Sequence, residues 1–93
     1  MGGFSLNGNT HMEMKIKEQV RTFVTSNFYV TDPIALEDNA SLIDGGVIDS
    51  TGVLEIICYI EETYDISVED GEMLSDNLDS IERIAKFVAR KLS

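Results

Sequence analysis

The chain of 93 residues is long enough for one small domain and too short for a second hydrophobic core. Its formal net charge is −10, and between residues 22 and 82 there are fifteen acidic residues and no basic one. Because nucleic-acid phosphates would be repelled by such a chain, we expect no binding to nucleic acid.

Residues 1–11 are rich in Gly, Asn, Ser and Thr and show no periodicity. We interpret them as a disordered leader or a remnant of cloning, and residues 12–93 as the folded domain. The first predicted helix spans about 12–27. Its apolar residues recur at helical spacing: Ile16, Val20, Phe23 and Val24.

A long connection over residues 28–49 follows the first predicted helix. It contains the pairs Asp32-Pro33 and Gly45-Gly46, which are typical of turns. A connection of this length in a small domain is usually functional. Its apolar residues are numerous enough to attach it to a core: Ile34, Leu36, Leu42, Ile43, Val47 and Ile48.

The second predicted helix spans residues 50–64, and its two faces differ in composition. One face carries an apolar stripe at the spacing of a buried surface: Val53, Ile56, Ile57, Ile60 and Tyr64. The other face is acidic with apolar positions between the acids: Thr51, Leu54, Glu55, Cys58, Glu61 and Glu62.

A short third helix is expected over residues 69–74, although Gly71 weakens that prediction. The last helix is expected to begin with Asp79 as its cap and Glu82 three residues later. Its apolar face would be Ile81, Ile84, Ala85, Val88 and Leu92. The predicted fold is all-α: a small four-helix bundle of three longer helices and one short one, with a long loop between helices 1 and 2.

Cysteine usage and hydropathy bear on the compartment. Cys58 is the only cysteine, so no disulfide can form within the chain, which favours a reducing environment. No apolar run approaches the length of a membrane span, and no signal-peptide pattern is recognised. We therefore expect a cytoplasmic protein that acts as a monomer and does not enter a membrane.

Several kinds of catalytic site are poorly supported by the sequence. The only histidine, His11, lies in the expected leader, so Ser50 has no evident base to activate it as a nucleophile. No histidine or cysteine cluster offers a metal site, and the Gly45-Gly46 pair is not followed by a phosphate-binding pattern. Calcium-loop spacing is absent as well.

Ser50 stands where the long connection becomes a helix, and two interpretations compete there. Either Ser50 or its neighbour Asp49 caps the helix, which is the usual role of such residues. Alternatively, Ser50 is a site that another enzyme modifies, because a helix N-terminus tolerates an attached phosphate. Val53 and Gly52 occupy the capping-box positions, so capping alone explains the stretch poorly. Gly52 also weakens the first turn, which makes sense where close approach matters.

Residues 46–55, Gly-Val-Ile-Asp-Ser-Thr-Gly-Val-Leu-Glu, resemble the modification site of acyl carrier proteins and peptidyl carrier domains. In that family an Asp-Ser pair opens the second helix of a four-helix bundle. The resemblance covers about residues 14–92, including the long loop, the acidic second helix and the last helix. It departs from the family at Thr51 and Gly52, because Leu or Met usually follows the serine.

The resemblance implies that a phosphopantetheinyl transferase attaches a 4'-phosphopantetheine arm from coenzyme A to Ser50. The thiol of the arm would carry acyl, aminoacyl or related groups as thioesters for fatty-acid, polyketide or peptide-type synthesis. Asp49 would lie near the transfer chemistry. The partners implied are loading ligases, synthases and acyltransferases with basic docking patches. Their docking face would be Thr51, Leu54, Glu55, Cys58, Glu61 and Glu62.

On this interpretation the chain is a non-catalytic carrier, and the cargo thiol belongs to the arm and not to Cys58. Two alternatives remain open. One is an unmodified acidic module that binds a basic partner through the same helix. The other is an independent serine hydrolase, which would have to show turnover as an isolated chain.

Overall fold

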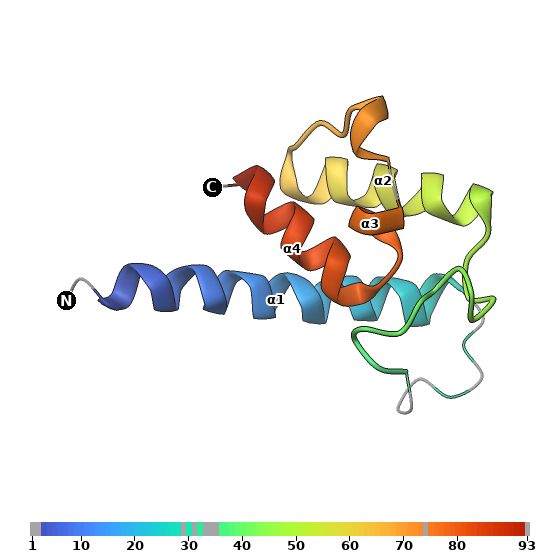
Figure 1. Cartoon of the computed structure of the whole chain (residues 1–93), viewed down its shortest axis with the longest axis horizontal. Helices are drawn as coiled ribbons and strands as arrows, with labels where there is room; N and C mark the ends of the chain where they lie inside the picture. The colour runs from blue at the N-terminus through green and yellow to red at the C-terminus, as the bar shows by residue number, and fades with distance from the viewer. Residues whose placement is uncertain (1–2, 29, 31, 33–35, 74, 93) are drawn as a thin grey trace.

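The computed structural model describes residues 3–28, 30, 32, 36–73 and 75–92, with residues 3–10, 75 and 76 described as backbone only. The elements in order are α1 (Gly3–Asn27), α2 (Ser50–Tyr64), the 3₁₀ turn η1 (Asp70–Glu72), α3 (Ser75–Leu78) and α4 (Ile81–Leu92). Figure 1 shows α1 as the longest element, with α2 above it and α3 and α4 between them in this view. Every regular element in the described part of the chain is helical, which confirms the predicted all-α class.

Two boundaries differ from those predicted. α1 begins at Gly3 and not near residue 12. The backbone of residues 3–11, which we expected to be a disordered leader, is therefore part of the first helix. The short helix expected over 69–74 is instead the 3₁₀ turn η1, and α3 begins only at Ser75. A reciprocal capping box between Glu69 and Glu72 closes η1 as one tight turn. Leu74, the last residue of the predicted short helix, lies outside the described residues.

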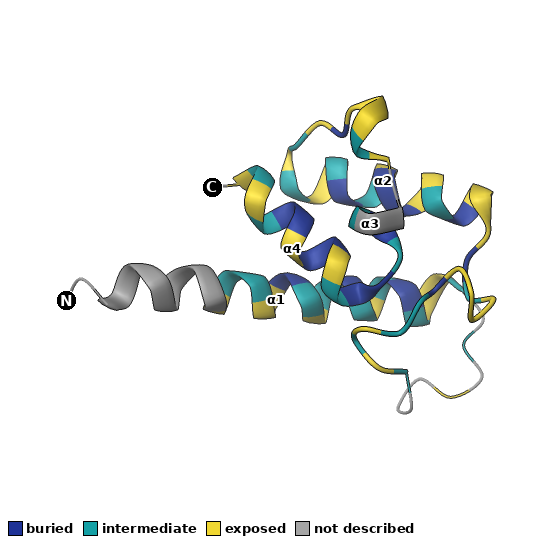
Figure 2. Ribbon diagram, viewed as in Figure 1, coloured by how far each residue is buried: buried dark blue, intermediate teal, exposed yellow. Residues whose placement is uncertain are grey.

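The core lies where α1, α2 and α4 face one another, and Figure 2 shows their buried positions turned inward. The predicted apolar stripes of α1 and α2 supply much of it. Phe87 of α4 is 2% exposed although the helical pattern did not select it, whereas Leu92 is 41% exposed and lies outside the core. The buried hydrophobic residues of the described helices are Ile16, Val20, Val24, Ile56, Ile57, Ile60, Leu78, Ile81, Ile84, Ala85, Phe87 and Val88.

An aromatic cluster joins α1 to α2 beside the core. The rings of Phe23 and Tyr59 are stacked, with centroids 4.1 Å apart and planes at 16°. The Tyr64 hydroxyl donates a hydrogen bond to Gln19 Oε1 at 2.5 Å. Burial and the neighbouring Tyr59 raise the pKa of Tyr64, so its hydroxyl keeps the proton that it donates. These contacts hold α2 against the second half of α1.

The long connection is attached to two helices through Asp38. Arg21 of α1 donates to Asp38 Oδ1 at 2.6 Å and to the Leu36 carbonyl at 2.6 Å. The amide of Glu82, in the first turn of α4, donates to the Asp38 carbonyl at 2.8 Å. Two apolar residues of the connection, Leu42 and Ile48, are buried in the core, as predicted. The connection is therefore part of the packed structure along its second half.

The first turn of α4 has a different cap from the predicted one. Ser80 Oγ accepts a hydrogen bond from the Arg83 amide at 3.1 Å, which is the geometry of an N-cap. The Asp79 carboxylate instead accepts hydrogen bonds from the long connection, at Ser41 and Ile43. The prediction of Asp79 as the cap of α4 was therefore wrong by one residue, because Asp79 is used in a contact far along the chain.

Among the described helices, none has both the length and the apolar character that crossing a bilayer would require.

Candidate functional site at the start of α2

Asp49 is the N-cap of α2. Its backbone is extended, with φ −114° and ψ −168°, and its Oδ1 accepts a hydrogen bond from the Gly52 amide at 2.8 Å. Ser50 is the first residue of the helix and is exposed. No described residue forms a hydrogen bond with the Ser50 hydroxyl. Of the two capping alternatives, the structure selects Asp49, and the serine oxygen takes part in no capping contact among the described residues.

Gly52 is explained by packing within the chain. A Cβ at this position would lie 3.0 Å from Ile48 Cβ and 3.0 Å from Phe28 Cε1, closer than side chains normally approach. Gly52 is accordingly buried in spite of its place in the first turn. The close approach that the sequence suggested is thus made by the chain's own Ile48 and Phe28. Through this contact, the residue after α1 (Phe28) and the end of the long connection (Ile48) pack directly against the start of α2.

A compact turn precedes Asp49. The Leu42 carbonyl accepts hydrogen bonds from the amides of Val47 at 2.9 Å and Ile48 at 3.2 Å. Gly46 has φ +76°, a left-handed conformation that side chains other than glycine rarely adopt. The Gly45-Gly46 pair, which the sequence marks as typical of a turn, therefore includes one glycine that the backbone of this turn requires.

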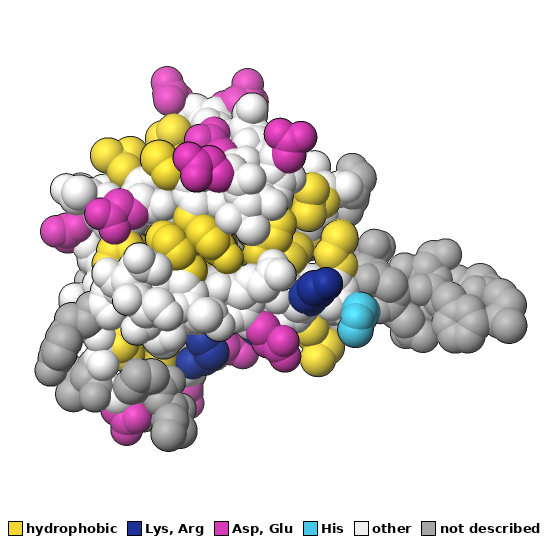
Figure 3. Space-filling model, turned by 180° about the vertical axis from the view of Figure 1, so that it is seen from behind, with side chains coloured by type: hydrophobic (Ala, Val, Ile, Leu, Met, Phe, Trp, Pro, Cys, Tyr) yellow, Lys and Arg dark blue, Asp and Glu magenta, His cyan; other side chains and the backbone are white. Residues whose placement is uncertain are grey.

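A groove of about 520 Å³ runs along the exposed face of α2 and is completed by α1. The carboxylates of Glu55 and Glu62 lie on its lining, and the aromatic rings of Phe23 and Tyr59 give it apolar surface. Figure 3 shows this side of the molecule, with a band of hydrophobic side chains and acidic side chains above it. The lining residues are Phe23, Asn27, Thr51, Leu54, Glu55, Cys58, Tyr59 and Glu62.

Five of the six residues predicted to form a docking face line this groove, and Glu61 does not. The Glu61 side chain is half-buried, and its Oε2 accepts a hydrogen bond from the Val68 amide at 2.9 Å. Glu61 therefore holds the chain that follows α2, which makes it a poor docking residue.

α1 contributes to the groove in a way that we did not predict. Phe23, one of the apolar residues at helical spacing in α1, is only half-buried and lines the groove together with Asn27 one turn later. The spacing of Phe23 and Asn27, four residues apart on a helix, places them on one face. This spacing was visible in the sequence, but the partner surface on α2 was not.

A second hollow of about 520 Å³ includes Ser50 in its lining. It is mainly apolar, and Ile43 in its wall is 40% exposed. Ser50 lines this hollow, and the adjacent Thr51 lines the groove. The lining residues are Phe28, Ile43, Gly46, Val47, Ile48, Asp49 and Ser50.

The surroundings of Ser50 provide few groups for catalysis. His11 lies on α1 in a separate hollow with Met14, Lys15 and Glu18, and it lines neither hollow beside Ser50. The nearest carboxylate along the chain, Asp49, is engaged in capping. Within the part of the chain described, no three His, Cys, Asp or Glu side chains lie together as a metal site.

Comparison with known proteins adds no further constraint. No protein-family model matches the sequence, and no curated protein matches it significantly. The function of the chain must therefore be inferred from its own residues and their geometry.

Proposed function

We propose that this protein is a carrier that holds acyl, aminoacyl or related groups as thioesters on a 4'-phosphopantetheine arm attached to Ser50. The proposal rests above all on one observation. An exposed serine hydroxyl without a described hydrogen-bond partner stands in the first turn of α2, directly after the aspartate that caps the helix. The Asp-Ser motif of carrier proteins occurs at this place in the sequence. On this proposal, α1 to α4 correspond to the four-helix bundle of that family.

The start of α2 is a suitable place for a phosphodiester. The first amides of a helix have no intrahelical acceptor, and the helix dipole places partial positive charge there. The Asp49 carboxylate accepts the hydrogen bond of the Gly52 amide, so it orders the first turn while Ser50 stays exposed. A phosphate on Ser50 would therefore be accommodated electrostatically without unfolding the cap.

A phosphopantetheinyl transferase would make the attachment. The Ser50 oxygen would bond to the pantetheine-bearing phosphorus of coenzyme A, the bond to the nucleotide would break, and adenosine 3',5'-bisphosphate would leave. The transferase would supply the Mg²⁺ and the base that takes the serine proton, because the residues lining the groove and the second hollow include no histidine and the adjacent Asp49 carboxylate is engaged in capping. The chain itself would be a substrate and not an enzyme.

The acidic groove suits the docking of the enzymes that load and use the arm. Glu55 and Glu62 are exposed on its lining, and Leu54 on the same lining is 56% exposed. No basic residue lies between 22 and 82, so a ligase, synthase or acyltransferase would meet this face with Lys and Arg around an apolar contact. Such a monomeric carrier would work in the cytoplasm, where its partners and coenzyme A are available.

The intact mass of the protein tests this proposal. The chain would be incubated with coenzyme A, Mg²⁺ and a broad-specificity phosphopantetheinyl transferase, alongside a carrier protein that the enzyme is known to modify. We expect one added phosphopantetheine on the native chain and none on Ser50→Ala. Ser67→Ala is the matched control, because Ser67 is also exposed but lies in the connection after α2, and this variant should gain the arm. An unmodified native chain beside a modified control carrier would overturn the proposal.

The second candidate is an unmodified acidic module that binds a basic partner through the same groove. The observation in its favour is the groove itself, which needs no arm to attract a basic surface. Biological complementation with Ser50→Ala separates the two, since the binding module would keep its function and the carrier would lose it.

A further inference from the structure

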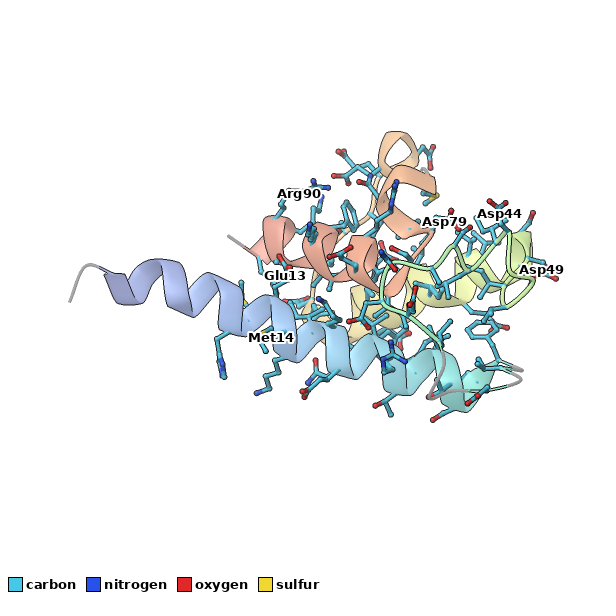
Figure 4. The ribbon with its side chains drawn as sticks, turned by 60° about the horizontal axis from the view of Figure 1, so that its bottom comes forward. Glu13, Met14, Asp44, Asp49, Asp79 and Arg90 are labelled. Carbon is cyan, nitrogen blue, oxygen red and sulfur yellow. The ribbon has the colours of Figure 1, made fainter. Side chains whose placement is uncertain are left out.

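The turn that leads to Ser50 is held by one residue from the other end of the sequence. Asp79 lies between α3 and α4, and both of its carboxylate oxygens accept hydrogen bonds from Ser41 Oγ, at 2.9 and 2.8 Å. Its Oδ1 also accepts from the Ile43 amide at 3.1 Å, and its carbonyl accepts from the Leu42 amide at 2.6 Å. Figure 4 shows Asp79 at the same end of the molecule as Asp44 and Asp49.

The contacts of Asp79 continue as far as the first turn of α2. Ser41 Oγ accepts a hydrogen bond from the Asp44 amide at 3.0 Å while it donates to Asp79. Ser41 therefore links the next residues of the turn to Asp79. Leu42, held by the Asp79 carbonyl, accepts from the amide of Ile48 at 3.2 Å. Ile48 is 4% exposed and packs against Gly52. A continuous series of bonds and contacts thus connects Asp79 with the turn that presents Ser50.

The core does not require this arrangement. Leu42 and Ile48 could be buried by many loop conformations, because apolar burial is not directional. The Ser41 hydroxyl and the Ile43 amide bond to the Asp79 carboxylate, and the Leu42 amide bonds to the Asp79 carbonyl. Such directional bonds impose a single geometry, and the two donors to the charged carboxylate form stronger bonds than neutral pairs do. The bonds therefore select one conformation of the turn before Asp49.

We propose that Asp79 and Ser41 are positioning residues for the modification of Ser50: they hold residues 41–48 in the conformation that the transferase recognises. This inference rests on the proposed function. Neither residue touches the reacting atoms, and both act through the turn. A serine presented by a turn that samples many conformations would meet the transferase correctly less often, which lowers the rate of transfer.

The test is the kinetics of arm attachment, at a temperature where every variant is folded by circular dichroism. For Ser41→Ala and Asp79→Ala we expect kcat/KM to fall on the order of tenfold, a loss that misplacement of a reacting group readily produces. Ser41→Thr keeps the hydroxyl and should restore most of the rate. Asp70→Ala removes the same charge from the exposed turn η1 and should leave the rate unchanged.

Amide hydrogen exchange separates positioning from general loss of structure. In Ser41→Ala, exchange should become faster in residues 43–49, while the buried amides of α1 and α4 keep their protection. If Asp79→Ala does not fold, Ser41→Ala and Ser41→Thr still decide the question. Native rates in Ser41→Ala would overturn the inference and leave the proposed function intact. A native chain that gains no arm would overturn both, because the reaction served by the turn would not exist.

Discussion

The two faces of α2 have opposite relations to the rest of the molecule. Ile56, Ile57 and Ile60 are at most 4% exposed and pack into the core formed with α1 and α4. On the other face Leu54 is 56% exposed and Cys58 is exposed, although both are apolar. The buried face therefore sets the position of the helix, and the exposed face is the one that we propose for docking.

The largest effect on stability should come from the buried face. Ile60→Ala would leave a cavity at a fully buried position, at a cost of about 3 kcal/mol in the free energy of unfolding. Leu54→Ala on the exposed face is the matched control and should change that free energy by less than about 0.5 kcal/mol. Urea denaturation followed by circular dichroism measures both. Equal losses in the two variants would contradict the division of α2 into two faces.

A smaller effect is expected where α2 meets the long connection. Alanine normally favours a helix over glycine by about 1 kcal/mol, yet Gly52→Ala should destabilise the protein by about 1 kcal/mol. The new methyl group would press on Ile48 and Phe28 at 3.0 Å. Gly71→Ala is the control, because no atom lies within 4 Å of its added carbon. If Gly52→Ala raised the denaturation midpoint, both tight contacts would have to be relieved by shifts of Phe28 and Ile48.

The smallest effect on stability, and a clear one on association, is expected from charge reversal in the groove. Glu55→Lys combined with Glu62→Lys should leave the unfolding free energy within about 1 kcal/mol of the native value, since both side chains are exposed. Docking to the transferase should slow about fivefold or more at low salt, and the difference should shrink as salt is added. Glu18→Lys, an exposed change on α1 outside the groove, provides the comparison. Equal association rates for the Glu55→Lys/Glu62→Lys variant and the Glu18→Lys variant would assign docking to another face.

The helical pattern of the sequence predicts the buried side of α2 correctly because burial repeats with the helical period. Ile56, Ile57 and Ile60 are recognised from spacing alone. The choice between Asp49 and Ser50 as the cap depends on backbone angles. Residue type alone does not predict it, since Asp and Ser both cap helices well.

Contacts between distant residues were the part that the sequence could not supply. Asp79 was a reasonable cap for α4 by its position, but its carboxylate bonds with Ser41, 38 residues earlier. Gly52 drew attention as a weak point in a helix, and the reason for it lies in Phe28 at the far end of the connection. In each case the residue type was informative, and only the fold identified its partner.

Cys58 has a practical consequence for handling this protein. It is the only cysteine of the chain, it is exposed, and it lies in the groove about two helical turns after Ser50. In air, two copies can become joined through this thiol, which would cover the groove in both. Preparations for binding work should therefore contain a reductant. The same thiol also accepts a maleimide spin label or fluorophore without mutagenesis, so the native chain carries its own reporter beside Ser50.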